Sequence, residues 1–176
     1  RRQRQMCIRD RVVELMGRHC GYLANYAAIA SGSDLVLVPE IRSNLKDILE
    51  TLRSRKRKNK NSSIVAVAED ARVYDKGKLL LKTASIRDDY GKIKMGGIGI
   101  QIKDLLAEKL KCEVRCTVLG HVQRGGSPTA QDRILATRMG VKAIEMLRAH
   151  KYNKLIATVN GEIVARPLSI VRKGLK

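Results

Sequence analysis

Short runs of apolar residues without polar alternation are the feature that most constrains the fold of this chain. Leu35–Val38 and Ile64–Ala68 are continuous apolar stretches, and Pro39 stops the first. Such a run is typical of a strand that is buried on both faces, as in a parallel sheet covered by helices. Runs that include polar residues, at Val12–Met16 and Glu113–Leu119, indicate two further strands.

Segments with helical spacing of apolar residues separate these strands. We expect one helix over Leu23–Ala30 and another from Ser43 as N-cap through Leu52. A third is expected after the stretch GGIG (96–99) through Leu110, and a fourth from Ser127 as N-cap, with Pro128 first, to about Ala149. Strands that alternate with helices predict an α/β fold with a mostly parallel sheet. Turn signals at Lys76-Gly77 and Asn160-Gly161 predict two hairpins.

The net charge of +19 raises the possibility of a nucleic-acid-binding module. Aromatic residues are scarce, with five Tyr and no Phe or Trp, so a base-stacking platform is difficult to build. The one dense basic run, Arg53–Lys60, is more simply a solvated helix end. Binding to nucleic acid is therefore the weakest of the functional hypotheses.

No apolar run approaches the roughly 18 residues that a membrane span needs, and residues 1–30 lack the order of a secretory signal. We therefore expect a cytoplasmic protein without a membrane partner. The four cysteines, Cys7, Cys20, Cys112 and Cys116, have no framework spacing. On a strand, positions 112 and 116 lie on the face opposite to His121, so we expect reduced thiols and no metal site.

Charged and polar residues follow three of the predicted strands. Arg18 and His19 come after the first, Glu69 after Ile64–Ala68, and His121 and Arg124 after the last. The carboxyl ends of parallel strands meet at one edge of a sheet, where ligands bind. Arginine binds phosphate with two parallel hydrogen bonds, and a carboxylate accepts from sugar hydroxyls. The pattern predicts a site for a phosphorylated sugar; the alternative is a set of ordinary exposed loop residues.

Four segments resemble the 6-phosphofructokinases: MGRHCGYLA (16–24), SGSDLVLVPE (31–40), VAVAE (65–69) and TVLGHVQRGGSPTAQDRILATRMG (117–140). The resemblance implies the three-layer fold of that family with a mostly parallel sheet. It also implies a glycolytic kinase that transfers a phosphoryl group from ATP to the 1-hydroxyl of fructose 6-phosphate. Residues 12–123 then form most of the fructose-6-phosphate-binding domain, and 124–176 return toward the donor-binding domain.

The resemblance also assigns roles to single residues. Met16, Gly17 and Arg18 match the sugar-phosphate turn of the family, and Glu69 matches its carboxylate for the sugar hydroxyls. His121 and Arg124 match residues that bind the substrate, in particular its 6-phosphate.

Two more matches concern assembly and regulation. Arg115 matches an arginine that reaches the 6-phosphate in a neighbouring subunit, which implies a homo-oligomer, a dimer or a tetramer. Asp34 matches a position at the nucleotide effector site of allosteric bacterial members, and the basic run near Lys60 falls near their effector lysines.

Other motifs of the family do not occur in this sequence. The family carries a glycine-rich GGD motif for the donor phosphates and a catalytic aspartate upstream of the matched region. Phosphoryl transfer needs a positioned base and Mg²⁺ beside the donor. We therefore expect the N-terminal donor-binding half, with its Mg²⁺ site, to be absent, and the fragment alone to be inactive.

The phosphoryl donor has two interpretations. HCGYLA resembles the ATP-dependent members of the family. The segment from Glu69 to Arg115 is longer than in short bacterial ATP enzymes, and KMGGIGIQIKDLLAEKL (94–110) resembles a mixed group that uses ATP or pyrophosphate. A pyrophosphate-dependent enzyme is the alternative.

The opening stretch RRQRQMCIRDR, residues 1–11, has neither helical nor strand periodicity. It resembles the translation of an adapter from sequencing libraries, and we interpret it as foreign to the native protein. Without its five arginines and one aspartate, the net charge falls from +19 to +15.

Overall fold

The computed structural model describes residues 10–60, 62–83, 86–87, 93–94 and 97–173. Nine of the eleven residues interpreted as foreign therefore lie outside the described residues. The chain divides into two compact units, Arg1–Gly125 and Gly126–Lys176. The division falls two residues after the predicted domain boundary at 123/124, and the roles assigned to the two parts stay predictions.

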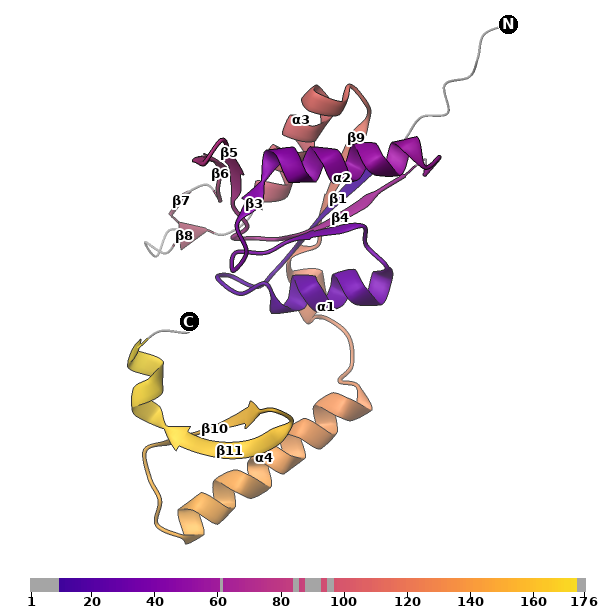
Figure 1. Ribbon diagram of the computed structural model, residues 1–176. Helices are drawn as coiled ribbons and strands as arrows, with labels where there is room; N and C mark the ends of the chain where they lie inside the picture. Colours follow the sequence, from indigo (N-terminus) through magenta and orange to yellow (C-terminus); the bar gives the residue numbers. More distant parts are fainter. Residues whose placement is uncertain (1–9, 61, 84–85, 88–92, 95–96, 174–176) are drawn as a thin grey trace, which may run out of the picture. The chain divides into compact units, whose positions relative to one another are not determined.

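The first unit is built on a four-stranded parallel sheet with the order β2-β4-β1-β9 (Figure 1). Its strands are β1 (Asp10–Leu15), β2 (Leu35–Leu37), β4 (Ile64–Ala68) and β9 (Val114–Val118). Three of them lie within segments that the apolar pattern predicted as strands, and β1 overlaps the fourth. The α/β class with a parallel sheet is therefore confirmed.

Helices cover both faces of this sheet. Helix α1 (Tyr22–Ser31) lies on one face, and α2 (Leu45–Arg57) and α3 (Ile98–Leu110) lie on the other (Figure 1). Because side chains alternate along a strand, Val65 and Val67 pack with α2 and α3, whereas Ala66 and Ala68 pack with α1. Both faces of β4 are thus buried, which is why its sequence is continuously apolar.

Smaller elements complete the first unit: β3 (Ser43–Asn44), β5 (Val73–Asp75), β6 (Lys78–Leu81), β7 (Ile86–Arg87), β8 (Ile93–Lys94) and the 3₁₀ helix η1 (Gly120–Arg124). Strands β5 and β6 form an antiparallel pair. Lys76 and Gly77 join them with φ angles of 45° and 81°, so the predicted hairpin turn is confirmed.

The second unit holds α4 (Ala130–Arg148), the antiparallel hairpin of β10 (Lys154–Val159) and β11 (Glu162–Pro167), and the 3₁₀ helix η2 (Leu168–Lys173). Asn160 and Gly161 turn the hairpin with φ angles of 51° and 81°, as their sequence predicted. No helix within the described part of the chain combines the length and the apolar character that crossing a membrane requires.

Three local predictions were wrong. Helix α4 begins after Thr129 rather than Ser127, because the Thr129 side chain and the Asp132 carboxylate cap each other's backbone N–H in a reciprocal capping box. Helix α2 has Asn44 as its N-cap rather than Ser43. Strand β1 begins at Asp10, two residues before the predicted run Val12–Met16.

Candidate functional site

A tight loop, Met16–Gly21, follows β1 at the carboxyl edge of the sheet. The Cys20 N–H donates to the Gly17 carbonyl at 3.0 Å, which closes the turn. A Cβ atom on Gly17, whose φ is 155°, would lie 2.3 Å from the Cys20 carbonyl oxygen, so only glycine fits there. Arg18 itself has a φ of 49°. The loop therefore holds a conformation that few sequences adopt.

The carboxylate of Glu69, directly after β4, fixes the middle of this loop. Its Oε1 atom accepts hydrogen bonds from the backbone N–H of Gly17, at 3.2 Å, and from that of Arg18. Bonds from N–H groups to a carboxylate are among the stronger hydrogen bonds in proteins. Two of the predicted site segments are thus in direct contact.

Gln123 of η1 fixes the start of the loop. Its Oε1 accepts a hydrogen bond from the Met16 N–H at 2.8 Å. The same 3₁₀ turn carries His121 and Arg124, whose side chains are exposed. The segment after β9 is therefore in contact with the segment after β1, as expected for the carboxyl ends of parallel strands.

The end of the loop is held by two further carboxylates. Asp70 contacts the ring of His19, with 2.8 Å between its Oδ2 and Nδ1. Glu40, just beyond β2, accepts from the Gly21 N–H with both oxygens, at 2.8 and 3.1 Å. The bond from Gly21 lowers the pKa of the Glu40 carboxyl below its ordinary value. Three neighbouring strands thus supply side chains that immobilise one loop.

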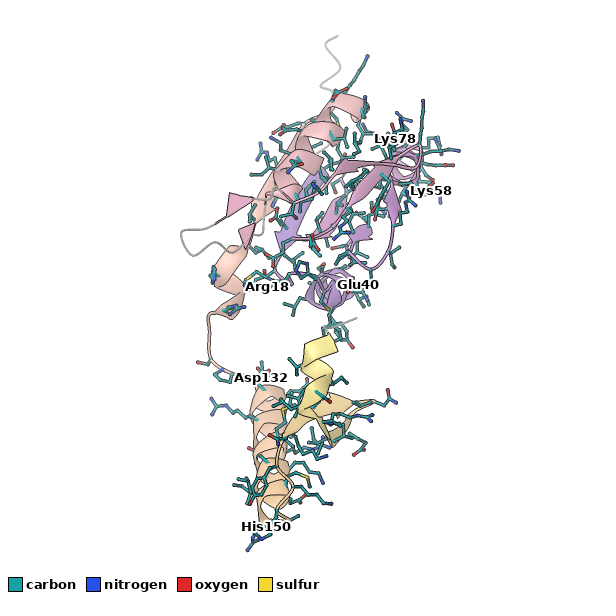
Figure 2. All side chains as sticks on the ribbon, turned by 90° about the vertical axis from the view of Figure 1, so that its left-hand side faces the viewer. Arg18, Glu40, Lys58, Lys78, Asp132 and His150 are labelled. Carbon is teal, nitrogen blue, oxygen red and sulfur yellow. The ribbon has the colours of Figure 1, made fainter. Side chains whose placement is uncertain are left out.

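Figure 2 shows Arg18 and Glu40 toward one end of the first unit and Lys58 toward the other. Asp34 lies at the amino edge of the sheet, because it precedes β2 and its Oδ2 accepts from the N–H of Ile64, where β4 begins. Its Oδ1 forms an ion pair with Arg55 at 2.7 Å. Asp34 therefore meets the basic run at the amino edge of the sheet, away from the loop Met16–Gly21.

Arg115 lies within β9, three residues before its end, rather than at the carboxyl edge. Its guanidinium contacts the Glu113 carboxylate at 2.8 Å, and the side chain is about half exposed. The structure thus brings Glu69 together with the loop residues Met16, Gly17 and Arg18. Gln123 joins this loop to the turn that carries His121 and Arg124. Arg115 and Asp34 lie elsewhere in the first unit.

Sequence reasoning overlooked Gln123, Asp70 and Glu40. Gln123 and Asp70 lie shortly after strand ends at which the sequence predicted a site, so position alone could have singled them out. Glu40 follows β2, whose end was not among the three predicted to carry the site. A cavity of about 410 Å³ lies apart from this loop, along α2, and none of the candidate site residues lines it. Among the described residues, no group of three or more His, Cys, Asp or Glu side chains could hold a metal ion.

Comparison with known proteins shows which family this chain resembles. A family model described as "Phosphofructokinase" matches residues 4–147. An ATP-dependent 6-phosphofructokinase from Spirochaeta thermophila is 41% identical over 165 residues, which cover 94% of this chain and 44% of that protein. A pyrophosphate–fructose 6-phosphate 1-phosphotransferase from Dictyoglomus thermophilum is 34% identical, over 91% of this chain and 46% of that protein.

Solved structures agree with the sequence comparison. Phosphofructokinase from Pichia pastoris in the T-state superposes with a TM-score of 0.70 and 32% identity, over 96% of this chain and 17% of that chain. Phosphofructokinase from Saccharomyces cerevisiae gives a TM-score of 0.70 with 34% identity, over 94% of this chain and 20% of that chain. The chain thus spans less than half the length of the curated relatives quoted above.

Proposed function

Since the chain belongs to the phosphofructokinase family, we propose that the complete protein transfers a phosphoryl group from ATP to the 1-hydroxyl of fructose 6-phosphate. This chain supplies the sugar-phosphate side of the reaction. The proposal rests on how the loop Met16–Gly21 is held. Glu69, Gln123 and Glu40, which follow three different strands, each accept a hydrogen bond from the backbone of this loop. A loop fixed in this way holds Arg18 ready for an anionic substrate without reordering.

Each predicted residue has a role in this proposal. Arg18 and Arg124 bind the phosphate of the sugar, because a guanidinium matches phosphate geometry. Glu69 keeps Oε2 for a sugar hydroxyl while Oε1 bonds the loop. His121 lies on the same exposed turn as Arg124 and contacts the sugar.

Arg115 acts outside this chain's own site. Its place within β9, away from the loop Met16–Gly21, suits contact with a neighbouring copy in a dimer or tetramer. Asp34 remains proposed for an effector site, but both of its oxygens already bond protein groups, Arg55 and the Ile64 N–H. An effector must therefore displace the ion pair with Arg55.

The donor and its Mg²⁺ belong to parts of the protein beyond the described residues. Among the residues that the structure describes, no cluster of His, Cys, Asp or Glu side chains suits a metal ion. Pyrophosphate is the alternative donor, because the relatives described above include one named for ATP, at 41% identity, and one named for pyrophosphate, at 34%.

The proposal is tested with the complete protein, recovered from its full reading frame. Fructose 6-phosphate is supplied with ATP and with pyrophosphate in parallel, and the formation of fructose bisphosphate is measured. We expect turnover with ATP. Turnover with pyrophosphate alone would favour the alternative donor, and no turnover with either contradicts the proposed function.

A further inference from the structure

His19 and Asp70 form a pair that the roles proposed above do not use. The His19 Nδ1 atom lies 2.8 Å from the Asp70 Oδ2 atom. The two partners differ in exposure, since the His19 side chain is 70% exposed and that of Asp70 is 11% exposed. A largely buried carboxylate therefore holds one nitrogen of an exposed ring, and the other nitrogen, Nε2, has no hydrogen-bond partner among the described residues.

This pair stands beside the contact that fixes Arg18. Glu69 accepts from the N–H of Arg18, and the next residue, Asp70, holds the ring of the next loop residue, His19. Consecutive carboxylates after β4 thus bind consecutive residues after β1. The Arg72 guanidinium also approaches the Asp70 Oδ2, at 3.5 Å, which helps to hold the carboxylate in place.

A purely structural role accounts poorly for this arrangement. A polar contact with one largely exposed partner contributes little to stability, while burying Asp70 has a desolvation cost. The loop is already held by Gln123, Glu69 and Glu40 without His19. A carboxylate that fixes an imidazole through Nδ1 is instead a common way to orient Nε2 toward a reacting or bound group.

We propose that His19, oriented by Asp70, is a further binding residue whose Nε2 donates a hydrogen bond to a phosphate oxygen. A protonated histidine donates from both nitrogens, here to Asp70 and to the phosphate. The inference rests on the proposed function, which offers two sources of this oxygen: the phosphate of the sugar and the phosphoryl group of the donor. Arg18, the preceding residue, adds positive charge for either.

The test measures kcat and both KM values of the complete protein with His19→Ala, His19→Gln and Asp70→Asn. His150→Ala is the matched control, because His150 is an exposed histidine of the second unit, outside the proposed site. We expect His19→Ala to raise one KM by about three- to tenfold, the range for one lost hydrogen bond, with kcat within about twofold. A rise for the sugar phosphate or for the donor identifies the source of the oxygen.

Two further results are expected if His19 binds substrate. His19→Gln recovers most of the lost affinity, because its amide can donate in place of Nε2. Asp70→Asn shifts the same KM, and adding it to His19→Ala has little further effect, because the two residues act as a unit. Thermal unfolding of each variant is followed alongside.

Three outcomes contradict the proposal. If His19→Ala lowers the melting temperature but leaves both KM values unchanged, the pair is a structural tie only. If His150→Ala raises the same KM equally, the effect is not specific to this loop. If the unaltered protein shows no turnover, the proposed function fails and this inference fails with it, whereas turnover with unchanged KM values overturns the inference alone.

Discussion

The amide oxygen of Gln123 lies 2.8 Å from the backbone nitrogen of Met16, so one hydrogen bond joins segments 107 residues apart in the sequence. Gln123→Ala leaves this N–H without its protein partner and frees the start of the loop. We expect a rise of about three- to tenfold in the KM for fructose 6-phosphate, since one hydrogen bond is lost. Gln131→Ala, on the exposed surface of α4, is the control and should change nothing.

Arg124→Ala tests the proposed contact with the sugar phosphate. Loss of a charge-assisted contact costs about 1.5–3 kcal/mol, so kcat/KM for fructose 6-phosphate should fall by more than about tenfold. Lys58→Ala removes an exposed charge at the opposite edge of the sheet and should cost less than about 0.5 kcal/mol. Equal and small effects of the two substitutions would contradict the site assignment.

Gly99→Ala tests the close contact between α3 and β1. A Cβ atom at this position would lie 2.9 Å from Oε2 and 3.0 Å from Cβ of Glu14, a buried side chain. We expect a loss of about 1–3 kcal/mol in the free energy of unfolding, the cost of overpacking. Gly140→Ala is the matched control on α4, where nothing lies within 4 Å, and should stabilise by about 0.5–1 kcal/mol. Chemical denaturation of both variants measures these changes in the free energy of unfolding.

Glu40 predicts a dependence of stability on pH. The hydrogen bond from Gly21 lowers the pKa of this carboxyl in the folded protein. A lowered pKa contributes stability that is fully present above the unfolded pKa and is lost as the pH falls through the folded one. Glu40→Gln should therefore be less stable than the unaltered protein at neutral pH, and the difference should shrink in acid. A difference that is constant with pH in urea unfolding contradicts this origin.

Asp10 predicts a stabilising substitution. This residue of β1 is only 3% exposed, and its Oδ1 has no hydrogen-bond partner among the described residues. Asp10→Val should raise the free energy of unfolding by about 1–3 kcal/mol, because it removes an incompletely paired buried carboxylate. Thermal and chemical unfolding measure the change, and a less stable variant would show that the carboxylate is satisfied.

Local patterns predicted the elements of this fold because each depends on neighbours in sequence. The apolar runs around Val65 and Leu35 became buried parallel strands, and Asn160-Gly161 turned a hairpin. Errors arose where two capping residues competed, as at Ser127 and Thr129. The reciprocal hydrogen bonds between Thr129 and Asp132 make Thr129 the N-cap.

The sequence by itself determined the α/β class, the strand ends that carry polar residues and the motifs of the phosphofructokinase family. Only the tertiary structure decided what those residues bond. Glu69 bonds the loop backbone, Asp70 orients His19, and Gln123 reaches Met16. These contacts join residues more than 50 positions apart, and the partner of a polar side chain depends on which strands the folded sheet places side by side. Periodicity along the chain does not show which strands become neighbours in the sheet.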